Sequence, residues 1–132
     1  MPTRSTTPLI GERVQVYWNL HKNCYSVQAL SGPSKNRVAA HTFLVDLADV
    51  TFAVQPAGRQ RIVNGEPKNV HAFIRGTVVC SLDGVTADYT EVTYNPHKYT
   101  SFVRKAEGSA ISGASVVRAY TDNQGRPVIM AA

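Results

Sequence analysis

Three segments of the sequence combine aromatic, amide and basic residues more densely than a hydrophobic core requires: residues 17–25, 68–75 and 94–99. Proteins hold single-stranded nucleic acids with cationic side chains along the backbone and with aromatic rings that stack on bases, while amides read the base edges. The same side-chain types recur in these segments, so we expect them to form a surface that binds a polyanion. The residues expected to contribute are Tyr17, Asn19, His71, Phe73, Arg75, Lys98 and Tyr99.

The histidines of these segments allow a second interpretation, in which the surface cleaves phosphodiesters without a metal ion. One imidazole would act as the base, another as the acid, and a lysine would stabilise the pentacoordinate phosphate. The residues for such a nuclease are His21, His71, His97 and Lys98. A zinc site is not expected, because no H-x-x-x-H or paired-cysteine spacing occurs and no carboxylate adjoins a histidine. We therefore expect no cofactor and favour binding over catalysis.

The elements that would position these residues are mostly strands. Alternation of period two over residues 13–20 indicates a half-buried strand, with Val14, Val16 and Trp18 on its inward side. Residues 24–30 should return as the second strand of a hairpin, with Tyr25 and Val27 inward. Further strands are expected over residues 38–46, 50–54, 70–80, 92–94 and 99–103, with a bend at residues 47–49 and a final hairpin over residues 115–130.

One short helix is expected after Pro56, which suits a first helical position, and before Gly65, which suits a C-terminal cap. Ile62 and Val63 would pack this helix on the sheet. About seven to eight short strands with one helix predict a mainly β fold, either a small antiparallel barrel or a strongly bent sheet. An α+β arrangement is the alternative. Residues 1–11 are expected to form a flexible N-terminal arm, and residues 12–132 a single β-rich domain.

Composition fits a globular protein with an anionic partner. Lys and Arg number 14 against 9 Asp and Glu, a formal net charge of +5, and the isoelectric point is about 9.5. Such an excess attracts RNA, DNA or nucleotides. Neither a P-loop nor a G-x-G-x-x-G motif is present, which excludes those two nucleotide cradles. Without an export signal or an apolar run of about 20 residues, we expect a cytoplasmic protein that does not contact membranes.

The two cysteines, Cys24 and Cys80, are widely separated in the sequence. We expect both to be unpaired thiols, since a disulfide framework belongs to exported proteins. Lys22 lies close to Cys24 in the sequence, and a nearby cation favours the reactive thiolate form of a cysteine.

The stretches Tyr-Trp-Asn-Leu-His, Asn-Val-His-Ala and Tyr-Asn-Pro-His-Lys lie within residues 17–21, 69–72 and 94–98. On these stretches the sequence resembles small proteins encoded in bacteriophage genomes, over most of the part expected to fold. The resemblance implies a phage origin and an action inside the infected bacterium. It brings no activity and no site residue with it.

A third class of function stays open beside nucleic-acid binding and cleavage. A phage product of this size could inhibit a host protein, or evade host defence by capturing a signalling nucleotide. Exposed strand edges and an N-terminal arm would suit a homo-oligomer or the capture of a partner. Our main expectation is the binding of single-stranded RNA or DNA in the host cytoplasm.

Overall fold

The computed structural model describes residues 10–19, 22–30, 37–66, 70–84 and 87–132. Most of the expected N-terminal arm, residues 1–9, therefore lies outside the described residues, as do His21 and Lys68. Ile10 and Gly11 form a turn, and the amide of Gly11 donates to the carbonyl of Val78. This hydrogen bond holds the start of the described chain against the end of a central strand.

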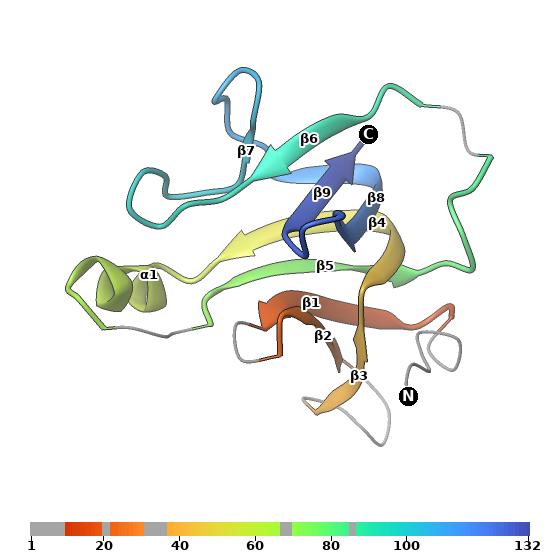
Figure 1. Ribbon diagram of the computed structural model, residues 1–132, viewed down its shortest axis with the longest axis horizontal. Helices are drawn as coiled ribbons and strands as arrows, with labels where there is room; N and C mark the ends of the chain where they lie inside the picture. The colour runs from red at the N-terminus through yellow and green to blue at the C-terminus, as the bar shows by residue number, and fades with distance from the viewer. Residues whose placement is uncertain (1–9, 20–21, 31–36, 67–69, 85–86) are drawn as a thin grey trace.

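Nine strands and one helix make up the described residues, and all strands belong to one antiparallel sheet (Figure 1). The sheet runs in the order β3-β2-β1-β5-β4-β8-β9-β6-β7. Because β3 and β7 stand at its two ends without joining, the predicted mainly β fold is confirmed as a bent open sheet rather than a closed barrel. The strands are β1 (Arg13–Asn19), β2 (Cys24–Ala29), β3 (Val38–Thr42), β4 (Leu44–Val54), β5 (Ala72–Val78), β6 (Thr90–Thr93), β7 (Val103–Arg104), β8 (Gly113–Thr121) and β9 (Pro127–Ala131).

The first hairpin follows the predicted alternation. β1 pairs with β2 in register from Val14 opposite Ala29 to Asn19 opposite Cys24. Val14, Val16 and Val27 are fully buried on the inward side, as period two requires of a half-buried sheet. Asn23 has a positive φ of 52° in the turn between the strands, a conformation that asparagine tolerates.

β4 differs from the prediction, which placed a strand end at the bend of residues 47–49. The strand continues through the bend, because Asp49 takes a positive φ of 53° and the pairing with β5 shifts register between Ala48 and Thr51. An irregularity of this kind bends a strand without ending it. The strand is interrupted earlier, at Phe43. β3 and β4 are therefore separate strands: β3 lies at one end of the strand order and pairs with β2, whereas β4 lies in the middle between β5 and β8.

The helix α1 (Pro56–Val63) forms where the sequence predicts it, with Pro56 in its first turn and Gly65 beyond its end at φ 104°. Its packing differs from the prediction. Val63 is 43% exposed, and Gly58 is the buried residue of the helix. The predicted packing of Val63 on the sheet is therefore wrong, whereas Ile62 is half-buried.

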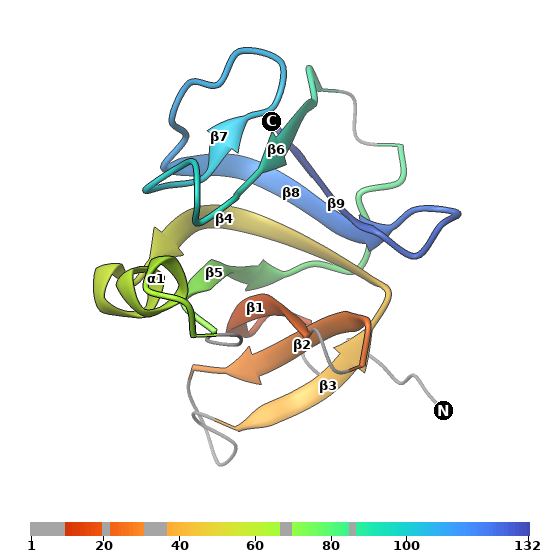
Figure 2. The same ribbon diagram turned by 60° about the vertical axis from the view of Figure 1, so that its left-hand side comes forward.

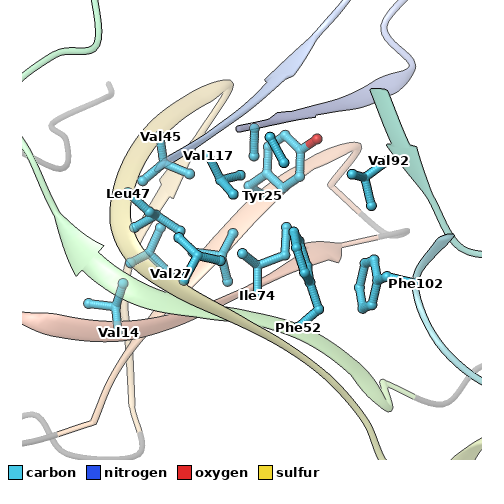
Figure 3. Packing of buried hydrophobic residues seen from close by; sticks show 14 of the residues in the cluster. Val14, Tyr25, Val27, Val45, Leu47, Phe52, Ile74, Val92, Phe102 and Val117 are labelled. Carbon is cyan, nitrogen blue, oxygen red and sulfur yellow. The ribbon is translucent and has the colours of Figure 1, made fainter. Parts of the chain in front are cut away.

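The sheet curls around one hydrophobic core, which Figure 3 shows from close by. Tyr25 from β2 lies inside the curl at 2% exposure, and its ring packs edge-on against Trp18 at 5.0 Å between centroids. Its hydroxyl lies 3.1 Å from the carbonyl oxygen of Tyr120 in β8 and 3.2 Å from that of Val128 in β9. This single side chain therefore ties the two halves of the open sheet together.

Two further features bear on the expected compartment and chemistry. Within the described part of the chain no helix is long and apolar enough to span a membrane. Cys24 is buried and Cys80 exposed, and both are free thiols. Burial raises the pKa of the Cys24 thiol, and Lys22 offsets this only in part, so burial outweighs the effect of the neighbouring lysine.

Candidate functional site

A small aromatic pocket opens between the end of β1 and the strands β6 and β9. Its cavity volume is about 220 Å³. The aromatic residues in its wall come from three parts of the chain: Tyr17, Trp18, Tyr25, Tyr94 and Phe102. Tyr94 and Phe102 stack with their centroids 5.3 Å apart and their planes tilted by 30°, and Phe102 also packs on Phe52. Such a pocket offers flat apolar walls to a planar ring.

The loop that carries Lys98 and Tyr99 begins and ends in the wall of this aromatic pocket, at Tyr94 and Phe102. Asn95 shapes the loop: its carbonyl accepts the amides of Lys98 and Tyr99 at 3.0 and 2.8 Å, and its side chain accepts the amide of His97 at 2.9 Å. These bonds make a compact turn over residues 95–99, and of the strand predicted over residues 99–103 only Val103 lies in a strand, β7. His97 and Lys98 are exposed on this turn.

The helix α1 abuts the same loop. The guanidinium Nε of Arg59 donates to the carbonyl oxygen of Tyr99 at 2.8 Å. The side chain of Lys98 reaches over the Tyr99 ring, with Nζ 6.0 Å from the centroid. In both ribbon views α1 and this loop lie side by side at one end of the sheet (Figures 1 and 2).

This end of the sheet is basic. The ion pairs found among the described residues use only Lys105 and Arg118 as cations, so Arg59, Arg61 and Lys98 keep their positive charge unopposed by a carboxylate contact. We call Arg59, Arg61 and Lys98 the basic rim. Arg61 and Lys98 are exposed and Arg59 is half-buried. Cations near an aromatic pocket combine the two elements by which single strands are held.

The residues that the sequence predicted on one face of the sheet lie close to one another, but they differ in solvent exposure. They are Tyr17, Asn19, Phe73 and Arg75. Tyr17 meets Phe73 edge-on with centroids 5.9 Å apart. Arg75 is fixed on the same face, where its Nε donates to Oε1 of Gln15 at 3.1 Å. Asn19 donates from Nδ2 to the hydroxyl of Ser26 at 3.1 Å. Phe73 is only 7% exposed, so its ring supports Tyr17 rather than offering a stacking surface.

His71 is also buried, at 6% exposure, and its Nε2 lies 2.7 Å from the hydroxyl of Tyr94. The two rings meet edge-on at 5.4 Å between centroids. His71 therefore holds a wall of the aromatic pocket in place. Of the four residues of the nuclease interpretation, the structure joins His97 and Lys98 in one exposed turn, buries His71 behind Tyr94, and does not describe His21.

Sequence reasoning missed the pocket itself. Trp18 was assigned to the core from its inward parity, and Phe102 was not singled out. The one signal was local: Tyr94 and Phe102 flank a loop with a turn-forming Asn-Pro pair and two basic residues. The described residues contain no cluster of three or more His, Cys, Asp or Glu side chains suited to a metal ion.

Comparison with known proteins places the chain among phage proteins. The sequence model of one family, the Mycobacterium phage L5 gene 82 protein, matches residues 8–125. The gene 82 protein of Mycobacterium phage L5 is 36% identical over 121 residues, which span 86% of this chain and 92% of that relative. No solved structure matches the chain. The match covers every element from β1 to β8, and the chain belongs to the phage L5 gene 82 protein family.

Proposed function

We propose that this phage protein binds single-stranded nucleic acid, RNA or DNA, at the basic rim and the aromatic pocket, inside the infected bacterium. One base would enter the pocket between Trp18 and Tyr94, a neighbouring base would stack on Tyr99, and the phosphates would lie along the rim. The observation that carries the proposal is the loop of residues 95–101. It presents a cation and a ring while both of its ends form the pocket wall.

The size of the pocket supports a single base as its occupant. Pockets for drug-sized ligands start at about 300 Å³, and this one is smaller at about 220 Å³. A paired base cannot reach such a pocket without leaving its duplex, which favours single strands. The net charge of +5 would draw the strand to the protein.

The first test measures the affinity for a fluorescently labelled single-stranded oligonucleotide by anisotropy at several salt concentrations. Lys98→Ala and Arg61→Ala should each weaken binding and lower the slope of log affinity against log salt by about 0.7, the counterion release of one phosphate contact. Tyr99→Ala should weaken binding by about 1–3 kcal/mol and leave the salt slope unchanged. The backbone contact of Tyr99 with Arg59 survives that change.

Arg37→Ala is the matched control. Arg37 is exposed, and its carbonyl pairs with Ala29 at the end of β2 that faces the start of β1, away from the pocket. If Arg37→Ala and Lys98→Ala weakened binding equally and Tyr99→Ala had no effect, the oligonucleotide would be bound by general positive charge, and the proposed site would be rejected. Absence of binding at low salt would reject the function.

Trp18 supplies a second, independent readout. It is the single tryptophan of the chain and lines the pocket. A base that enters the pocket should change the fluorescence of Trp18 in proportion to the anisotropy signal. Binding without any change in Trp18 emission would mean that the bases stay outside the pocket.

A protein partner is the second candidate, and one observation favours it. Phe43, just beyond the edge strand β3, is 62% exposed, and Leu44 beside it is 44% exposed. An edge strand with exposed apolar neighbours suits strand addition by a partner or by a second copy. Phe43→Ser should abolish capture of a host protein, or dimer formation in sedimentation experiments, if this edge is the interface.

A further inference from the structure

The outward face of the sheet carries a polar row that belongs neither to the aromatic pocket nor to the basic rim. Val16 and Ile74 are buried in the core, so the residues that alternate with them in β1 and β5 point outward. Among these, Gln15 in β1 stands opposite Arg75 in β5 on one side and opposite Gln28 in β2 on the other. The three side chains therefore form a row across three neighbouring strands.

This row orients the guanidinium of Arg75. Its Nε donates to Oε1 of Gln15 at 3.1 Å, and Nε2 of Gln15 donates in turn to Oε1 of Gln28. Both acceptors are neutral amides, so the hydrogen bonds fix the guanidinium without opposing its charge. Neither Nη atom of Arg75 has a partner among the described residues. Both reach solvent, because the Tyr89 hydroxyl is the one side-chain polar atom in the described part of the half-buried and buried chain that is both inaccessible and unbonded.

Arg118 in β8 shows the contrary arrangement on the same face, since Val117 beside it is fully buried. Its Nε and Nη2 donate to the two oxygens of the buried Asp46 at 2.8 Å each, and Nη2 also donates to Asp83 at 2.8 Å. Two carboxylates therefore oppose that guanidinium. By contrast, β1, β2 and β5 contain no Asp or Glu, so the charge of Arg75 has no carboxylate beside it on its own or the adjoining strands of the row.

Tyr17 places an aromatic ring near this arginine. It follows Gln15 by two residues, so Tyr17 and Arg75 are diagonal neighbours on paired strands, a separation that aromatic and long side chains can bridge. The ring of Phe73 packs edge-on against the half-buried Tyr17 and supports it from the sheet. Tyr17 also lines the aromatic pocket, so the pocket and the outward face meet at this residue.

We propose that Arg75 is a further phosphate-binding position for the strand that occupies the aromatic pocket, with one of its bases stacked on Tyr17. The inference rests on the proposed function for the identity of the ligand, and it extends the contact surface onto the outward face of β1 and β5. A guanidinium offers paired N–H donors to phosphate oxygens, and one that is already oriented loses less freedom when it binds. The absence of carboxylates from β1, β2 and β5 complements the negative charge of the strand.

The probe is a fluorescently labelled oligothymidine of about 12 nucleotides, within the range of about 4–16 that single-strand sites cover. Arg75→Gln should lower the slope of log affinity against log salt by about 0.7 and weaken binding about fivefold at about 0.1 M salt, the loss of one phosphate contact. Arg37→Gln is the matched control, because it removes the same charge from an exposed residue just before β3, three strands away from β5 in the sheet order. Equal falls of the slope in the two variants would overturn the inference.

Gln15→Glu tests the same contact while Arg75 stays in place. The substitution keeps an acceptor for Nε of Arg75 and sets a carboxylate against the guanidinium, so weaker binding does not reflect a lost hydrogen bond in the row. The salt slope should fall as far as in Arg75→Gln, and combining the two substitutions should lower it no further. An unchanged affinity of Gln15→Glu would contradict the role of Arg75.

Trp18 emission distinguishes this inference from the proposed function. If the oligothymidine changes Trp18 emission while Arg75→Gln binds it as Arg37→Gln does, the pocket stands and the phosphate position at Arg75 is refuted. If the affinity depends on Arg75 while Trp18 emission stays constant, the position at Arg75 stands and the pocket is refuted. An oligoglutamate peptide that displaces the oligothymidine equally well would make Arg75 a general anion contact and overturn the inference.

Discussion

The hydroxyl of Tyr25 is the sharpest place to test how the open sheet is held together. Tyr25→Phe keeps the ring and its contact with Trp18, and removes only the bond to the carbonyl oxygens of Tyr120 and Val128. A hydroxyl carries one proton, so the two contacts share one hydrogen bond. Its net contribution is about 1 kcal/mol, and for a chain of this size the melting temperature should fall by about 3–6 °C.

Urea denaturation followed by Trp18 fluorescence measures this loss directly, since no other tryptophan contributes. Tyr25→Ala should cost about 3–5 kcal/mol, because it also empties the centre of the core. The difference in the free energy of unfolding between the two variants separates the contribution of the hydrogen bond from that of the buried ring. Unchanged stability of Tyr25→Phe would refute the tie between the two halves of the sheet.

Alkaline pH gives a second measure of the same side chain. Burial raises the pKa of Tyr25 above its ordinary value near 10. The unfolded chain therefore loses this proton at a lower pH than the folded protein, and stability should fall as the pH rises above about 10. The fall should be smaller in Tyr25→Phe, which has no proton to lose at this position, and an equal fall in both proteins would contradict the assignment.

The remaining predictions concern the central strand β4. Gly113→Ala should destabilise the protein by about 1–3 kcal/mol, because its Cβ would lie 2.7 Å from the carbonyl oxygen of Val50; an unchanged melting temperature would contradict the tight approach of β8 to β4. Arg118→Met should lower the free energy of unfolding in urea by up to about 3–5 kcal/mol, because it deprives the buried Asp46 of its cation. Asp83→Asn should have a small effect on this free energy, since Asp83 is exposed. Comparable losses of stability in the two variants would contradict the inference that Arg118 stabilises the protein mainly through its pair with the buried Asp46.

Local pattern predicted the parts of this fold that depend on neighbouring residues. The alternation of β1 and β2 shows directly which side chains face the core, and Pro56 and Gly65 bracket the helix. The bend near Asp49 was also visible in the sequence. It was assigned as a strand end because the pairing with β5 and β8, which carries β4 through the bend, is not a local property.

The candidate sites depended on contacts between distant segments, which period and spacing do not encode. Asp46 and Arg118 form an ion pair because β4 pairs with β8, and the local sequence around either residue does not predict this partner. Parity placed His71 and Phe73 on a polar face, but Tyr94 and Tyr17 cover them. Lys98 and Tyr99 remain accessible because they lie on a loop, where side chains are free of the sheet.

The strand order has a consequence for how the protein emerges from the ribosome. β1, β2 and β3 can pair as soon as they are made, but β4 needs β8, whose residues follow about seventy positions later. Until β8 is released, one edge of the longest strand stays unpaired and open to other chains. We expect the nascent protein to depend on chaperones during this interval.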